Sequence, residues 1–86
     1  MDSVLLTEVE AFAKLFFSPE KIMIILDLKK EDTIRDDFKK AYEKGRLIQE
    51  GLIRKSILEL AINGSSPAQV LAMKFIDDSK LDGISV

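Results

Sequence analysis

The chain has 86 residues, of which 47% are hydrophobic and 33% charged, and its formal net charge is −2. This composition indicates one ordered domain with a small core, because a disordered chain lacks the apolar side chains that offset chain entropy. The absence of cysteine and histidine excludes disulfide bonds, thiolate or imidazole metal sites and imidazole acid–base chemistry. Since the remaining carboxylates, lysines and hydroxyls form no known catalytic pattern, we expect no enzymatic activity, no cofactor and no metal.

The first predicted helix begins at Asp2 or Ser3, since either side chain can accept a hydrogen bond from a free N–H of the first turn. Its apolar residues recur at helical spacing, which predicts that they share one face. They are Leu5, Val9, Phe12 and Phe16.

A second, short helix is predicted to begin at Ser18-Pro19 and to run to about Leu26, with the serine as its cap and the proline at the first helical position. A buried strand over residues 22–26 is the alternative; the proline start and the lack of a second strand candidate favour the helix. Asp27 follows, where a helix-turn-helix motif usually has a glycine in its turn. The residues expected to face inward are Ile22, Ile25 and Leu26.

The apolar run 22–26 is also the longest in the chain, far below the roughly 18–20 residues that cross a membrane, and no signal peptide is recognisable. We therefore expect a cytoplasmic protein without a membrane partner.

The third helix is predicted to begin between Lys29 and Asp32 and to continue to about Ile62. Two acids near its start suit the positive end of the helix dipole. A stripe of apolar or small residues alternates between spacings of four and three, which is typical of a helix that packs along its length. The stripe comprises Ile34, Phe38, Ala41, Gly45, Ile48 and Leu52.

Two glycines lie inside this long helix, and each costs about 1 kcal/mol relative to alanine. Gly45 and Gly51 therefore indicate either a kink or the close approach of another backbone. Because the stripe exceeds what one short chain can cover, we expect other copies of the chain to pack on it. The predicted oligomer interface consists of Ala41, Gly45, Ile48 and Leu52.

The last helix, residues 67–78, follows a stop signal. Asn63-Gly64 supplies a left-handed residue that ends the long helix, and residues 66–69 (Ser-Pro-Ala-Gln) have the pattern of a capping box. We expect this helix to fold back on residues 52–61 as an antiparallel hairpin, and residues 79–86 to fray.

Basic residues concentrate in the middle of the chain. Residues 29–55 hold nine basic and six acidic side chains, net +3, whereas the remaining residues hold four and nine, net −5. Two short helices followed by a basic one is the order of a helix-turn-helix DNA reader. Acids at 31, 32, 36 and 37 are interleaved with the bases, so a solvated face is the competing interpretation. The candidate DNA-binding residues are Lys29, Lys30, Thr33, Arg35, Lys39 and Lys40.

Three segments, Ala41–Arg46, Arg54–Ala61 and Asn63–Gln69, together resemble phage terminase small subunits and related phage DNA-packaging proteins. The resemblance covers about residues 8–76. It implies that residues 8–40 face double-stranded DNA, that the candidate DNA-binding residues above occupy the recognition helix, and that the long helix with its hairpin drives assembly into a ring-like homo-oligomer. It also implies a large packaging subunit as a further partner, and the host cytoplasm as the location.

The sequence thus predicts an all-α protein with one domain over residues 1–86. Residues 3–45 form a helix-turn-helix-like three-helix region, residues 46–78 an oligomerising helical hairpin, and residues 79–86 a tail. The predicted function is non-enzymatic recognition of DNA for packaging. The alternatives are a helical interaction module that never binds DNA, and a transcriptional regulator that reads two half-sites about one helical turn apart.

Overall fold

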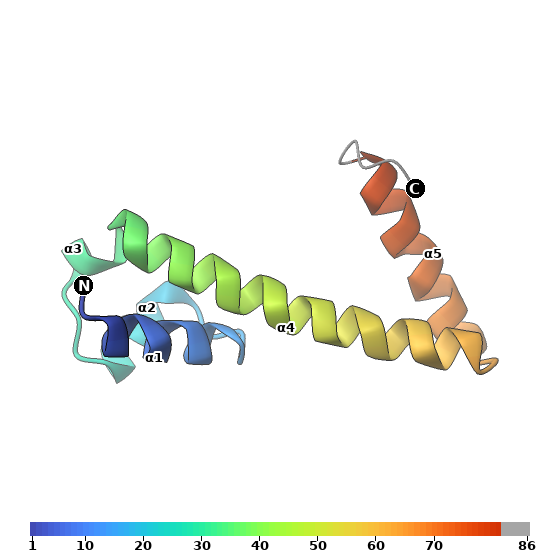
Figure 1. Ribbon diagram of the computed structural model, residues 1–86, viewed down its shortest axis with the longest axis horizontal. Coiled ribbons are helices and arrows are strands. Elements are labelled where there is room, and N and C mark those ends of the chain that lie inside the picture. The colour runs from blue at the N-terminus through green and yellow to red at the C-terminus, as the bar shows by residue number, and fades with distance from the viewer. Residues whose placement is uncertain (82–86) are drawn as a thin grey trace. The chain divides into compact units, whose positions relative to one another are not determined.

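The computed structural model describes the backbone of residues 1–81 and the side chains of residues 1–78 (Figure 1). Helices are the only regular secondary structure in the described residues, which confirms the all-α class. The chain forms two compact units, Met1–Glu50 and Gly51–Val86. The helices are α1 (Ser3–Ala13), α2 (Pro19–Ile25), α3 (Lys30–Thr33), α4 (Asp36–Ile62), which contributes to both units, and α5 (Ser66–Leu81).

Helix α1 begins as the sequence predicts. The Asp2 carboxylate accepts a hydrogen bond of 3.2 Å from the Val4 N–H. Val9 and Ala13 on this helix are buried. Phe16 does not join them, because α1 ends three residues earlier and Phe16 has a left-handed backbone with φ 63°. Its side chain is 42% exposed, so its predicted place on the inner face of the first helix is wrong.

Helix α2 also begins as predicted, since the Ser18 hydroxyl accepts a hydrogen bond of 3.3 Å from the Lys21 N–H. Ile22 is buried, but Ile25 is exposed, which contradicts its predicted inward position. The helix has seven residues, fewer than two full turns, and Ile22 is its buried residue, whereas Ile25 is its last residue. Asp27 then takes φ 54°, the left-handed conformation that the usual turn glycine would adopt and that Asp tolerates better than most residues.

The predicted third helix is broken in two, because α3 ends at Thr33 and α4 begins at Asp36. Asp32 closes α3 into a single turn by accepting a hydrogen bond of 3.0 Å from the Lys29 N–H. A continuous helix would place Ile34 and Phe38 on one face. With the break, Phe38 is 1% exposed and belongs to the core, whereas Ile34 is 66% exposed.

Phe38 packs with three side chains from α1 and α2 in the core of the first unit, namely Val9, Ala13 and Ile22. Helix α4 passes through Gly45 without interruption, and of the two alternatives left open there, the close approach of another backbone is the one observed. Gly45 is buried where α1 crosses α4: a Cβ atom there would collide with the Glu10 carbonyl and lie 2.9 Å from the Ala13 Cβ. The close crossing inferred from this glycine is therefore made by the chain's own first helix.

The second unit turns at Gly64, whose φ of +100° confirms the predicted stop. The cap of α5 lies one residue earlier than predicted, at Ser65 instead of Ser66. Its hydroxyl accepts from the Ala68 N–H at 3.4 Å, and its carbonyl accepts from the Gln69 N–H at 3.0 Å. The Gln69 side chain does not reach back to the cap, so the predicted capping box does not form.

Contacts near the turn and further out join the described parts of the helices of the second unit. The Gln69 amide donates to the Ala61 carbonyl at 3.1 Å near the turn, and the Arg54 guanidinium lies 4.5 Å from the Phe75 ring centre further out. Figure 1 shows α5 diverging from α4 with distance from the turn, so a closely packed antiparallel hairpin does not form. Residues 79–81 continue α5 and are not frayed; residues 82–86 lie outside the described part of the chain.

Candidate nucleic-acid interface

The six side chains predicted to contact DNA lie on four consecutive pieces of backbone instead of on one recognition helix. Since α3 has four residues, little more than one turn, it cannot lie along a DNA groove as a recognition helix does. Together the six residues form a bent, basic surface. In chain order it comprises Lys29 before α3, Lys30 and Thr33 within α3, Arg35 in the link, and Lys39 and Lys40 in the first turns of α4.

The cationic side chains of this set are exposed, as phosphate contacts require. Thr33 is half-buried, and its hydroxyl donates to the Lys30 carbonyl at 2.7 Å. This local hydrogen bond lies at the end of the short helix. It uses the hydroxyl proton that would otherwise be donated to a phosphate oxygen. The lysines are therefore the members of the set best placed to meet DNA.

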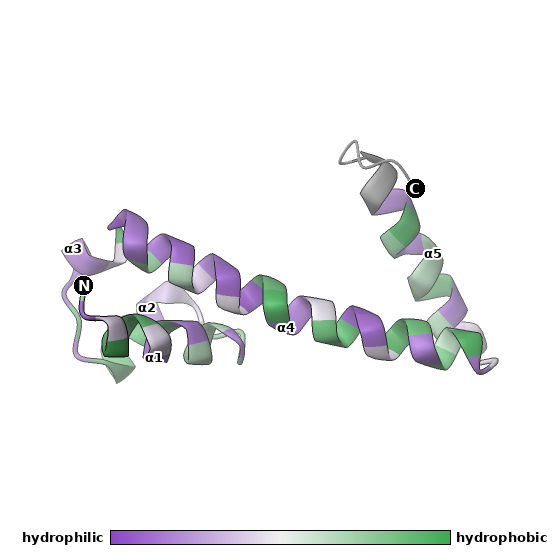
Figure 2. Ribbon diagram, viewed as in Figure 1, coloured by the Kyte–Doolittle hydropathy of each residue, from purple (hydrophilic) through white to green (hydrophobic). Residues whose placement is uncertain are grey.

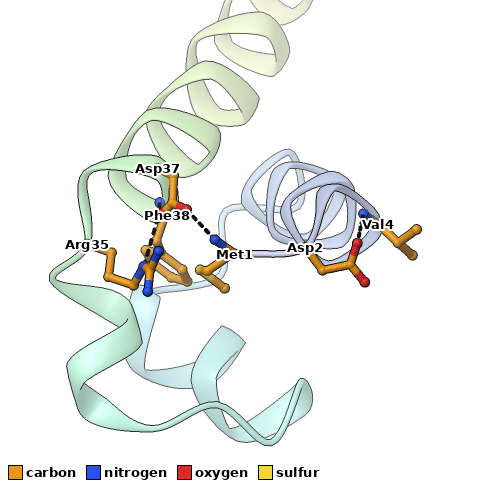
Figure 3. A network of polar contacts seen from close by, with 6 residues as sticks. All are labelled: Met1, Asp2, Val4, Arg35, Asp37 and Phe38. Carbon is orange, nitrogen blue, oxygen red and sulfur yellow. Dashed lines mark hydrogen bonds and ion pairs between the residues drawn. The ribbon is translucent and has the colours of Figure 1, made fainter.

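Asp37, one of the acids interleaved with these bases, is held by three partners (Figure 3). Its carboxylate accepts from the Met1 ammonium at 2.6 Å, from the Phe38 N–H at 2.9 Å and from Arg35 Nε at 3.3 Å. The hydrogen bond from the ammonium, together with those from Arg35 and the Phe38 N–H, lowers the pKa of Asp37 from 3.8 to about 2. The negative charge of Asp37 is thus balanced within the protein.

Replacing this carboxylate tests the network. We expect Asp37→Asn to lower the urea midpoint at pH 7, and the difference from the unsubstituted protein to shrink below about pH 4 and to vanish near pH 2. The sign follows from the pKa: a carboxylate with a lowered folded-state pKa adds stability above its unfolded pKa and loses it as pH falls through the folded value. The measurement is urea denaturation followed by circular dichroism at pH 7, 5, 3 and 2.

Asp36→Asn is the matched control, because Asp36 shares the first turn of α4 and its helix-dipole effect but makes no ion pair within residues 1–78. A pH-dependent loss of the same size in both variants would show that the dipole, and not the Asp37 network, carries the effect.

Asp32 is the second acid used inside the protein, since it caps α3 through the Lys29 N–H. Glu31 and Asp36 stay exposed. The outward charge of residues 29–40 therefore comes mainly from four lysines against three acids, Glu31, Asp32 and Asp36, because Arg35 is engaged by Asp37. Another nearby cation contributes less, since Lys44 Nζ lies 3.4 Å from Glu10 Oε1.

A groove of about 480 Å³ lies beside this surface in the first unit, and we call it the Tyr42 groove. The Phe38 and Tyr42 rings stack along it, with centres 6.4 Å apart and planes at 6°. Its apolar floor is flanked by side chains of both charges, so it suits an amphipathic partner better than a phosphate chain. Its lining is Pro19, Thr33, Phe38, Lys39, Tyr42, Glu43, Arg46, Leu47 and Glu50.

Arg46, which lines the Tyr42 groove, contacts two aromatic rings. Its guanidinium lies 5.3 Å from the Phe16 ring centre and 5.8 Å from that of Tyr42, and Nη1 donates to the Tyr42 hydroxyl at 2.9 Å. Such cation–π contacts each contribute about 0.5–1 kcal/mol at exposed sites. They connect Arg46 to Phe16, whose backbone is left-handed.

The four residues predicted to form the oligomer interface separate into two pairs. Gly45 is buried against α1, and Ala41 packs against the core of the first unit, so the chain itself covers both. Ile48 and Leu52 are exposed. This corrects the predicted interface, because helix α1 occupies the part of the stripe that was expected to meet another copy.

The chain matches no known protein-family model, and no curated protein or solved structure is significantly similar to it. None of the described helices has the length and apolar character needed to span a membrane. Within the described residues, no group of three or more carboxylates is arranged to hold a metal ion.

Sequence patterns did not reveal the Tyr42 groove. Tyr42 and Arg46 are four residues apart on α4, which is a recognisable helical pair. The position of Phe16 depends on a positive φ that no propensity predicts for a bulky aromatic residue.

Proposed function

We propose that the chain is a non-enzymatic, phage-type DNA-binding protein resembling a terminase small subunit, and that it recognises duplex DNA for packaging as a homo-oligomer. The observation that carries the proposal is how the protein uses the acidic side chains that lie between the lysines. Asp32 caps α3 and Asp37 pairs with the Met1 ammonium and Arg35, so two of the four acids expected to repel phosphates have partners inside the protein.

The structure favours contacts to the phosphate backbone over base reading. The exposed lysines lie on a bent surface, and no helix of that surface both carries them all and is long enough to enter a groove. Each copy then binds DNA weakly, since few phosphates are neutralised. Several linked copies would raise the affinity through effective concentration, without any stronger single contact.

The second unit supports the oligomeric part of the proposal. In residues 51–78 the buried apolar residues are two alanines, Ala68 and Ala72. Figure 2 shows hydrophobic segments along the second half of α4 and along α5. A unit of this size with so small a core needs an additional source of stability, and association is the usual one. Its exposed large apolar residues are Leu52, Ile53, Leu58, Leu60, Ile62, Val70, Leu71 and Met73.

DNA retardation with a salt series tests the proposal. We expect the protein to retard duplex DNA at low salt and to release it as salt rises. In Lys29→Ala/Lys30→Ala the slope of log K against log salt should fall by about 1.8, because each lost phosphate contact removes about 0.9. The matched control, Lys21→Ala/Lys55→Ala, removes two exposed lysines outside the basic surface and should leave the slope unchanged.

No retardation at low salt would remove the DNA part of the proposal. An equal loss of slope in both double variants would show that binding follows net charge and not this surface. Light scattering of the same samples without DNA tests the oligomeric part separately, and a single-copy mass at high concentration would contradict it.

The exposed apolar side chains and the Tyr42 groove favour a second candidate, a helical interaction module that binds a protein and never binds DNA. Reversing Lys29, Lys30 and Lys39 to glutamate distinguishes the two functions. DNA binding should collapse in that variant if the first proposal holds, whereas partner binding through the apolar surface of the second unit should persist if the second one does.

A further inference from the structure

We propose that the Tyr42 groove of one copy receives helix α5 of a second copy, in antiparallel orientation. Lys39 then faces the second copy's Asp78, and Glu43 faces the second copy's Lys74. The inference rests on the oligomeric part of the proposed function and names the surfaces that meet. It goes beyond the predicted interface, which did not include the groove.

The outer face of α5 carries apolar and charged side chains that complement those of the Tyr42 groove. Leu71, Lys74 and Asp78 follow one another at spacings of three and four, which places them on one face of the helix, with Val70 beside them. All four are exposed, and Val70 keeps 61% of its surface accessible. The face that turns towards the chain's own α4 is a different one and holds the buried Ala68.

Charge and spacing match between the two surfaces. Four residues separate Lys39 from Glu43 on α4, and four separate Asp78 from Lys74 on α5, or about 6 Å along each helix. None of these four side chains makes an ion pair within residues 1–78. In the antiparallel orientation each cation therefore meets an anion.

The apolar residues fall into the same register. Four residues beyond Glu43 lies Leu47, 57% exposed, and four residues before Lys74 lies Val70, so these two side chains face each other. A parallel orientation that keeps Lys74 at Glu43 would instead place Val70 at Lys39 and Asp78 at Leu47. That arrangement opposes charged and apolar groups and is disfavoured by the desolvation it requires.

We assign the occupant to another copy because the chain's own α5 is engaged within the second unit. The Arg54 guanidinium lies 4.5 Å from the Phe75 ring centre, and the Gln69 amide donates to the Ala61 carbonyl. These contacts hold α5 against the second half of α4.

The contact joins two different surfaces, the Tyr42 groove and α5, so it is heterologous. Each copy keeps one free groove and one free α5, and further copies add in the same way. Such a contact produces a closed ring if the rotation between neighbours closes, and an open chain if it does not. A symmetric pair that buries both sets of surfaces at once is not required.

Cross-linking between copies tests the pairing, because the chain has no cysteine of its own. A Leu47→Cys protein and a ¹⁵N-labelled Val70→Cys protein are mixed and treated with a short bis-maleimide. We expect mixed cross-linked dimers, identified by mass, at least about fivefold above those from the control mixture of Leu47→Cys with ¹⁵N-labelled Ile62→Cys. Both partners, Val70 and Ile62, are exposed, so neither substitution disturbs a core. Equal yields in the two mixtures would overturn the proposal.

Charge reversal gives an independent measurement. Lys39→Glu and Asp78→Lys should each weaken association at least about fivefold in a light-scattering dilution series, and the double variant should recover most of the loss. Lys21→Glu, an exposed reversal outside the groove, should leave the mass unchanged. No recovery in the double variant, with association otherwise intact, would sink this contact and leave the oligomeric proposal standing. A protein that is monomeric at every concentration would remove both.

Discussion

Phe38→Ala is expected to destabilise the first unit by about 3–5 kcal/mol, because it deletes the largest fully buried side chain and leaves a cavity between helices. Phe38 contacts the core residues of α1 and α2, so the loss should abolish their packing on α4. The measurement is urea denaturation followed by circular dichroism at a fixed protein concentration.

Ile34→Ala is the matched control. Ile34 precedes Phe38 by one turn on the predicted stripe but lies in the link before α4, where it is exposed. We expect a change within about 0.5 kcal/mol, as for other surface substitutions. A loss comparable to that of Phe38→Ala would show that the stripe is buried as a whole and that the break between α3 and α4 does not exist.

Gly45→Ala is expected to destabilise the first unit by about 1–3 kcal/mol, although alanine is the better helix former. The added methyl group would collide with the Glu10 carbonyl, which is backbone, and would lie 2.9 Å from the Ala13 Cβ. Relief requires α1 to move away from α4, which loosens the core around Val9. Thermal or urea unfolding of the variant measures the loss.

Gly51→Ala, a substitution in the same helix, is expected to have the opposite effect on stability. No atom lies within 4 Å of a Cβ placed at Gly51, so the substitution should stabilise α4 by up to about 1 kcal/mol through helix propensity alone. Destabilisation by Gly51→Ala would indicate that another copy approaches α4 closely at this residue. The two substitutions are chemically identical, so their difference isolates the contact with α1.

The ends of the helices were predictable because they depend on near neighbours in the sequence. Asp2 and Ser18 cap the helices that follow them, as expected from their side chains and the next few residues. Gly64 ends α4 for the same kind of reason. Each of these interactions spans at most a few residues, so their signals survive without tertiary context.

The candidate site was predictable in its composition but not in its geometry. The exposed lysines 29, 30, 39 and 40 were identified from charge alone. The break between α3 and α4 separates them, and Asp37, just after that break, pairs with the Met1 ammonium 36 residues away in sequence. Such a partner has no local signal, and so the acids were expected to compete with phosphates rather than to serve the fold.

The sequence by itself determined that this chain is helical, where several of its helices begin, and that its middle is basic. Those properties follow from hydrogen bonds and periodicities within a few residues. Only the tertiary structure decided that α1 occupies the crossing at Gly45, that Tyr42 and Arg46 line a groove, and that Ile34 is left outside the core. These features depend on which distant segments meet, because a face of a helix is buried or free according to the element that packs on it and not according to its own pattern.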